Sequence, residues 1–176
     1  MRNLYFFALL AGLLLPAGSW GQPGFNRTYD FGYPVHETYK LVVKNDTIVM
    51  YGLARQDTSP FQQCLFLARF DSIGQPVDHK LICDPNGGTY TAGINWSSII
   101  STSDGGFALT AGSFEANDGM LVKLRYDLSI EFSTVFFDTS NLVEFYRYII
   151  EQSDGYILIG YVVDPEKPLT PLFSQP

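Results

Sequence analysis

Short apolar segments alternate with polar turns along most of the chain. The clearest example, SDGGFALTAG at residues 103–112, returns as SDGYILIG at 153–160, and a weaker copy, NDTIVMYG, occupies 45–52. Matching Phe107 with Tyr156 gives a spacing of 49 residues, and matching Gly52 with Gly112 gives 60. A polar turn followed by an apolar strand, repeated at roughly 40 to 60 residues, is typical of stacked β-sheet arrays such as β-propellers.

The repeat predicts units of four antiparallel strands. In the first unit we expect strands at 39–43, 47–54, 63–70 and 77–83. In the second unit we expect 98–101, 107–113, 120–126 and 132–137, and in the third 148–151 and 156–163. Clusters of Gly, Asp and Asn mark the turns between these strands.

The fold class that this pattern predicts is all-β. The apolar runs at 48–51 and 156–159 do not alternate with polar residues, so we expect both faces of their sheets to be covered. This favours a partial β-propeller of four-stranded antiparallel blades, with a β-sandwich as the alternative. The units fall at about 38–83, 97–137 and 147–176, within an incomplete repeat domain at 22–176. About two and a half blades do not close a ring, so the chain is interpreted as a truncated or partial propeller whose open blade edges would self-associate.

The first 21 residues have the pattern of a secretory signal peptide. Arg2 provides the positive start, residues 4–15 are apolar, and Ser19 and Gly21 are small residues before a cut at Gln22. A membrane anchor is the alternative, but the apolar run is shorter than the roughly 20 residues that cross a bilayer. We therefore expect cleavage near Gly21 and Gln22, and a secreted, extracellular or cell-surface product without a membrane span.

The charge balance narrows the class of partner. Without Arg2, the chain carries 10 basic and 18 acidic residues, a net charge of −8. An acidic chain without a basic cluster argues against nucleic acid and anionic lipid as partners.

The two cysteines fall on a predicted hairpin. With a two-residue turn at Ile73 and Gly74, paired residues have numbers that sum to 147, and Cys64 and Cys83 meet this condition. Cross-strand neighbours are close enough for a disulfide, which an oxidising compartment would permit. Two free buried thiols are the alternative.

The repeats resemble a known family. SDGGFALTAG at 103–112, followed by GMLVKLRYD at 119–127, is similar to the repeats of large secreted bacterial β-propeller proteins, which commonly carry a C-terminal type IX secretion sorting domain. The opening FNRTYDF at 25–31 resembles the start of such proteins after the signal peptide. The resemblance implies extracellular placement with adhesion or ligand binding, and it implies no shared catalytic residues. We expect this chain to depart from the family in lacking the sorting domain and the remaining blades.

Catalytic and metal-binding patterns are weak in this sequence. It has no Gly-x-Ser-x-Gly elbow, and its two histidines, His36 and His79, have no partner at a recognisable spacing. The aspartates at the turns are expected to cap those turns through side-chain to backbone hydrogen bonds, rather than to bind calcium. We therefore assign no catalytic residue, no metal and no cofactor.

Loops at one rim of the units are better candidates for ligand contact. Aromatic side chains near these loops could form platforms for a carbohydrate or protein ligand: Tyr90, Trp96, Tyr146 and Tyr148. Packing between the sheets is the alternative role for them. The sequence thus predicts a non-catalytic binding or adhesion scaffold, or a fragment of one. The alternatives are a piece of an extracellular propeller hydrolase and a truncated gene product without function.

Overall fold

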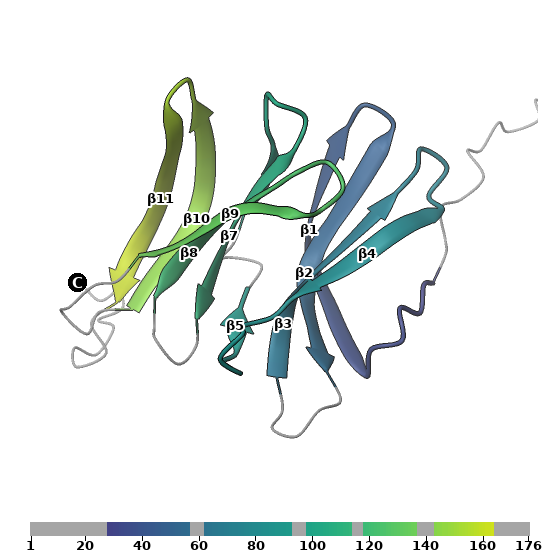
Figure 1. The fold of residues 1–176 in the computed structure, drawn as a ribbon, viewed down its shortest axis with the longest axis horizontal. Coiled ribbons are helices and arrows are strands. Elements are labelled where there is room, and N and C mark those ends of the chain that lie inside the picture. Colours follow the sequence, from purple (N-terminus) through teal and green to yellow (C-terminus); the bar gives the residue numbers. More distant parts are fainter. Residues whose placement is uncertain (1–27, 57–61, 93–97, 114–117, 137–142, 164–176) are drawn as a thin grey trace, which may run out of the picture.

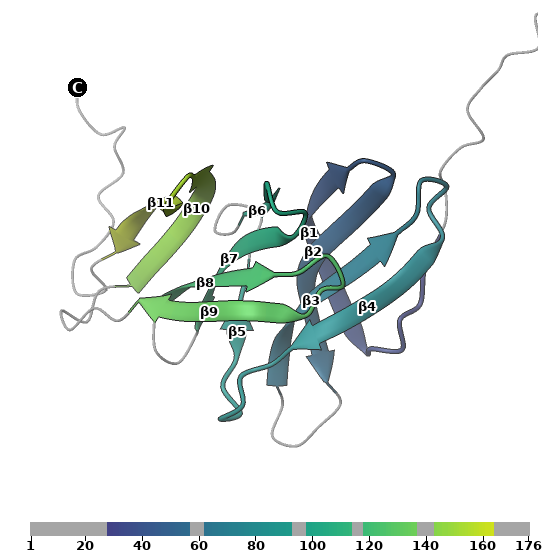
Figure 2. The ribbon, with the colours of Figure 1, turned by 45° about the horizontal axis from the view of Figure 1, so that its top comes forward.

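The computed structural model describes residues 28–56, 62–92, 98–113, 118–136 and 143–163. Over these residues the protein is all-β, with eleven strands in three antiparallel sheets and no α-helix. Figures 1 and 2 show the sheets following one another in chain order, with the middle sheet between the other two. The predicted all-β, antiparallel class is confirmed, and the described sheets do not close on themselves.

Sheet A contains the first four strands in chain order: β1 (Val35–Lys44), β2 (Thr47–Gln56), β3 (Gln62–Phe70) and β4 (Pro76–Ile82). A two-residue turn joins β1 to β2, and Asn45 takes the positive φ of 53° that such hairpin turns require. Strands β2, β3 and β4 begin and end within two residues of their predicted positions, whereas β1 begins four residues earlier than predicted.

Sheet B contains five strands: β5 (Tyr90–Thr91), β6 (Ile99–Ser101), β7 (Phe107–Ser113), β8 (Gly119–Leu124) and β9 (Ile130–Phe136). The sequence predicts four strands here and misses β5. In the structure, β5 and β6 both pair with β7, Tyr90 opposite Ser113 and Ile99 opposite Leu109. The first strand of this unit is therefore divided into two short pieces.

Sheet C consists of the hairpin β10 (Val143–Gln152) and β11 (Gly155–Val163). Within the described residues, β11 pairs only with β10. Its equivalents in the other sheets, β2 and β7, each have a strand on both sides.

The tip of the β3–β4 hairpin differs from the predicted two-residue turn. The Asp71 N–H donates to the Gln75 carbonyl at 3.0 Å, which closes a three-residue loop in which Gly74 has a φ of 75°. This loop shifts the pairing by one residue, so that Phe70 lies opposite Pro76 instead of Val77. A bulge at Val77 reverses the shift, and Arg69 lies opposite Asp78 as predicted. The rest of the hairpin therefore keeps the predicted register although the turn is of another kind.

The β8–β9 tip has the same geometry but places a leucine where β3–β4 has glycine. Leu128 has a φ of 61°, and its side chain is 1% exposed in the core between sheets A and B. A left-handed conformation costs a non-glycine residue about 1–2 kcal/mol. Burial of a leucine side chain contributes about 1.5–3 kcal/mol, which offsets that cost.

The main core lies between sheets A and B. It is formed by alternate residues of their central strands, including Val49, Tyr51, Leu65 and Leu67 from sheet A and Phe107, Leu109, Val122 and Leu124 from sheet B. The Tyr51 hydroxyl crosses this core and donates to the Thr110 carbonyl at 2.9 Å.

Two smaller apolar clusters lie on the faces of sheets A and B that point away from the main core. On the opposite face of sheet A, Phe66 and Phe70 pack against Tyr29, Phe31 and Tyr33 of the segment before β1. On the opposite face of sheet B, Ala108, Leu121 and Ile149 form a cluster that Tyr156 and Leu158 of β11 extend. Sheet B therefore has a core on each face, whereas the second face of sheet A is covered only in part, since Leu41 and Val43 of β1 are 63% and 65% exposed there.

Sheet C is covered on one face only. Its other face, called here the outer face of sheet C, consists of Tyr148, Ile150, Ile157 and Ile159, which are 62%, 43%, 48% and 46% exposed. The expectation that residues 156–159 are covered on both faces is therefore wrong for the described residues. Their lack of alternation comes from a strand with two apolar faces, of which only one meets sheet B.

Candidate functional site

The two ends of the sheets differ in their connections. Tight turns join the strands at one end, and β2, β4, β7, β9 and β11 all finish at the other, which we call the rim (Figure 1). The rim of sheets A and B offers the best-defined set of polar and aromatic groups among the described residues.

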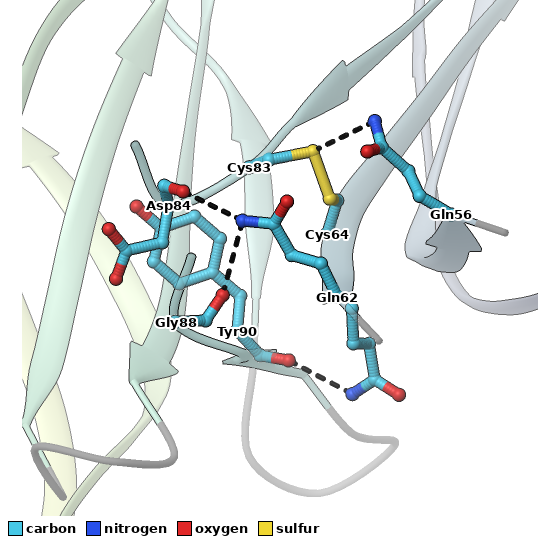
Figure 3. Close-up of a disulfide and its surroundings, with 8 residues drawn as sticks. Gln56, Gln62, Cys64, Cys83, Asp84, Gly88 and Tyr90 are labelled. Atoms are coloured by element: carbon cyan, nitrogen blue, oxygen red, sulfur yellow. Dashed lines mark hydrogen bonds between the residues drawn. A yellow bond between two sulfur atoms is a disulfide. The ribbon is translucent and has the colours of Figure 1, made fainter. Parts of the chain in front are cut away.

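A disulfide lies at this rim. Cys64 of β3 is joined to Cys83, just after β4, with an S–S distance of 2.04 Å and a Cα–Cα distance of 4.4 Å (Figure 3). Cys64 is fully buried, so the bond ties the edge strand β4 to the interior strand β3 where the chain leaves sheet A.

Glutamine side chains fasten the segment that follows the disulfide. Gln62 Nε2 donates to the Asp84 carbonyl at 2.7 Å, and Gln63 Nε2 donates to the Tyr90 carbonyl at 2.9 Å (Figure 3). A third glutamine, Gln56, places its Nε2 3.4 Å from the Cys83 sulfur. Because these groups hold both ends of the segment, the loop at 84–90 has a fixed position on sheet A.

The tip of this loop is exposed. Asp84 orders it by accepting from the Asn86 N–H at 2.8 Å and from the Gly87 N–H at 3.0 Å, the latter through its carbonyl. Pro85, Asn86 and Gly87 are exposed, and Gly87 has a φ of 83°. The arrangement presents a short loop, anchored at both ends, to solvent.

Tyr90 lies beneath this loop as a half-buried side chain. It packs against the main core from strand β5, and its ring lies beside Asp84 (Figure 3). Burial, with a smaller contribution from the Asp84 charge, raises the pKa of Tyr90. The hydroxyl is therefore a neutral hydrogen-bonding group over the whole physiological pH range.

Tyr146 and Tyr148, the other predicted platform residues that the structure describes, do not lie beside Tyr90. Tyr146 points between sheets B and C, where its ring centroid lies 5.5 Å from that of Phe136 and its ring occupies the space that a Cβ on Gly119 would need. Tyr148 lies on the outer face of sheet C. Trp96 is outside the described residues. The three described aromatic residues thus belong to three different surfaces.

The histidines are part of an aromatic cluster on sheet A. The rings of His79 and Phe31 have centroids 5.2 Å apart, and His36 lies 6.1 Å from the same phenylalanine. His79 also borders an open groove between β4 and residues 28–31. Both histidines thus pack against aromatic rings of this cluster.

The turn aspartates act as caps. Asp71 Oδ1 accepts from the Gln75 N–H at 2.7 Å, Asp104 Oδ1 from the Gly106 N–H at 3.0 Å, and Asp127 Oδ1 from the Ser129 N–H at 2.9 Å. In the part of the chain that the structure describes, no three His, Cys, Asp or Glu side chains are grouped to hold a metal ion.

The charged side chain of Lys123 is almost completely buried. Lys123 of β8, with 4% of its side chain exposed, lies 2.8 Å from Asp104 and 3.3 Å from Glu131. Burial alone would lower the pKa of Lys123, but the hydrogen bond and charge of Asp104 outweigh it, and the pKa is raised. The same hydrogen bond holds the pKa of Asp104 well below its usual range. Lys123 thus joins the β6–β7 turn to strand β9 across sheet B.

A comparison of the chain with protein-family models, curated proteins and solved structures found no match. Among the described residues, no helix is long and apolar enough to cross a membrane. Function must therefore be argued from the geometry of this chain alone.

Proposed function

We propose that this chain is a secreted β-propeller-type repeat protein that acts as a non-catalytic scaffold and binds a carbohydrate or protein ligand through its rim. The observation that carries the proposal is the exposed loop at 84–90, which the disulfide, Gln62 and Gln63 anchor at the rim. Binding loops are commonly built in this way, as exposed segments positioned by a stiff scaffold.

The stacking of the sheets supports the propeller-type architecture. Sheet B turns one set of alternate residues toward sheet A and the other set toward sheet C: Phe107 faces sheet A, and Ala108 faces sheet C. A two-sheet sandwich has a single core, whereas sheet B has a core on each face. A sheet with neighbours on both sides is what a propeller blade requires.

The disulfide supports export. Cys64 and Cys83 form a bond of the kind that persists in oxidising compartments and is rare in the cytosol. With cleavage after Gly21, the mature chain recovered from the medium or periplasm begins at Gln22. N-terminal sequencing of the exported protein tests this, and retention of residues 1–21 would contradict it.

Rim binding is tested with glycan and protein arrays probed by the exported, purified protein. The rim variant is Asn86→Lys at the exposed loop tip, and the matched control is Ile73→Lys, 64% exposed at the opposite end of sheet A. We expect a restricted set of ligands whose binding falls about tenfold or more in N86K, because a long charged side chain obstructs the loop, and is unchanged in I73K. Equal binding by both variants, or no ligand for the folded protein, would contradict the proposal.

A further inference from the structure

An open groove runs between the first half of β4 and the segment that precedes β1, which Figure 1 shows in purple beside β4. Its volume is about 470 Å³, and it is lined by residues 28–31 and 76–79. Ligand sites are commonly clefts of about 300–1,000 Å³. Because β4 begins at the β3–β4 turn and ends at the rim, the groove lies at the turn end of sheet A, away from the 84–90 loop.

One wall of the groove is the free edge of β4. Asp78 and His79 both line it, although successive residues of a strand point to opposite faces of the sheet, so the groove follows the edge rather than one face. Within the described residues β4 pairs only with β3, and no backbone hydrogen bond joins β4 to residues 28–31. An edge strand turns alternate N–H and C=O groups away from its partner, so β4 offers backbone donors and acceptors along this wall.

The other wall is held in place without a ligand. Tyr29 packs on Phe70 and Phe31 packs on Phe66, with ring centroids 5.0 and 5.1 Å apart. The Tyr29 hydroxyl also donates to the Gly74 carbonyl. Side-chain contacts thus fix residues 29–31 on sheet A, and an incoming ligand does not have to order them.

The groove is complementary to one positive charge. Its residues include two carboxylates and no lysine or arginine. The Asp78 carboxylate is already paired with Arg69, whose Nη2 lies 2.6 Å from it. Asp30 is exposed and accepts from the Gly32 N–H at 2.8 Å, but it forms no ion pair with a described lysine or arginine. Asp30 therefore leaves an uncompensated negative charge beside the aromatic rings.

We propose that the groove binds an extended peptide of a partner protein, which adds as a strand to the free edge of β4 and places a lysine or arginine beside Asp30. In such strand addition, main-chain hydrogen bonds provide affinity and alternate side chains provide specificity. The rings of Tyr29 and Phe31 contact the apolar stem of the basic side chain. A neutral saccharide can stack on the same rings, but it neither pairs with the strand edge as a backbone does nor balances the Asp30 charge.

The test is an NMR titration of the exported, purified protein with capped peptides of 7 residues, the length of β4. The peptides alternate valine and threonine around a central lysine, glutamine or glutamate. We expect amide shift changes confined to residues 28–31 and 76–82, and tighter binding of the lysine peptide than of the glutamate peptide by about fivefold. Methylation of alternate peptide nitrogens should abolish binding for one of the two alternate sets only, because only one set of N–H groups faces β4.

The variant that tests the charge is Asp30→Asn. An asparagine keeps an oxygen for the Gly32 N–H, so circular dichroism and the amide shifts of the free protein should change little. We expect D30N to lose the preference for lysine over glutamate. The matched control is Asp154→Asn, which removes the same charge from the exposed turn of sheet C and should keep the preference.

Three results with the peptides would overturn the proposal: no binding up to about 1 mM, shift changes outside the groove, or a lysine preference that D30N retains. Shift changes at the groove with cellotetraose and none with the peptides would also overturn it and assign the groove to a saccharide. The groove is separate from the rim, so Asn86→Lys should leave peptide binding unchanged, and failure of one proposal leaves the other standing.

Discussion

The hairpins β1–β2 and β10–β11 have two-residue turns, bulges and a glycine beside the bulge at equivalent positions, yet sheet B buries a face of the first that is exposed in the second. Sheet A gains a neighbour on each face, whereas sheet C gains only sheet B. The difference teaches that the backbone plan of a repeat is set locally, by its turn and bulge. Whether a face of the repeat is buried depends on whether another sheet packs against it.

The largest effect is expected at the glycines opposite the bulges. A Cβ on Gly52 would lie 1.7 Å from the Glu37 carbonyl oxygen, and one on Gly160 would lie 1.9 Å from the Phe145 carbonyl oxygen. Because the backbone must move, Gly52→Ala should lower the free energy of unfolding by about 3 kcal/mol or more in urea titrations.

The equivalent variant in sheet C, Gly160→Ala, tests whether the two hairpins unfold in the same way. Since sheet C has one neighbour, we expect this change to open its hairpin locally, seen as faster hydrogen exchange in β10 and β11 only. Equal losses of global stability in the two variants would show that sheet C is as integrated as sheet A.

Removing the disulfide should make sheet A more like sheet C. The bond between Cys64 and Cys83 closes a loop with a sequence separation of 19 residues, for which the chain-entropy model gives about 3 kcal/mol. The double variant Cys64→Ala, Cys83→Ala should lose this amount in denaturant unfolding. Reduction of the unchanged protein should give a similar loss, and no change in either experiment would contradict the stabilising role.

Truncation of equivalent side chains gives the direct measure of burial. Val49→Ala leaves a cavity in a site with no solvent exposure and should cost about 2 kcal/mol. Ile157→Ala removes more atoms from a half-exposed site, yet it should cost less than about 1 kcal/mol in dilute, monomeric protein. Thermal unfolding of both variants decides this, and a larger loss for Ile157 would mean that its face is covered in one copy.

The smallest effect concerns the charged pair of sheet B, which has no counterpart in sheet C. Asp104 has a lowered pKa, so its contribution is present above about pH 4, near the usual aspartate pKa, and is lost as the pH falls further. Because 51% of the Asp104 side chain is exposed, we expect Asp104→Asn to cost about 1 kcal/mol at pH 7.

Unfolding of the Asp104→Asn variant and the unchanged protein between pH 2 and 7 checks this prediction. The two stabilities should converge below about pH 4, as the aspartate of the unchanged protein takes up its proton. A difference that persists at low pH would assign the effect to the hydrogen bond with Gly106 rather than to the charge.

The sequence predicted much of the strand pattern because turns and apolar runs are local signals. Strands β2, β3 and β7 lie within one or two residues of their predicted positions, and the predicted register of β3 and β4 holds. The turn between them was wrong, because a bulge at Val77 compensates for a different loop length without changing the apolar pattern. Strand β5 was missed, since two residues carry no periodic signal.

The candidate site was less predictable. Periodicity shows that Tyr156–Ile159 has two apolar faces, but it does not show whether both are covered. The anchoring of the rim loop was also missed, because Gln62 and Gln63 bind backbone carbonyls more than twenty residues away. Every residue has a backbone carbonyl, so the sequence does not indicate which one is bound.

The order of the strands has a consequence for how the molecule assembles. Nearly every strand pairs with the next one along the chain, so each sheet is made from contacts of short sequence separation. Such sheets can form while later residues are still being synthesised, because local pairing does not wait for distant partners. Sheet A would then be the template on which sheet B condenses, and sheet B the template for sheet C. Folding would proceed in one direction, with each completed layer presenting a finished surface to the next.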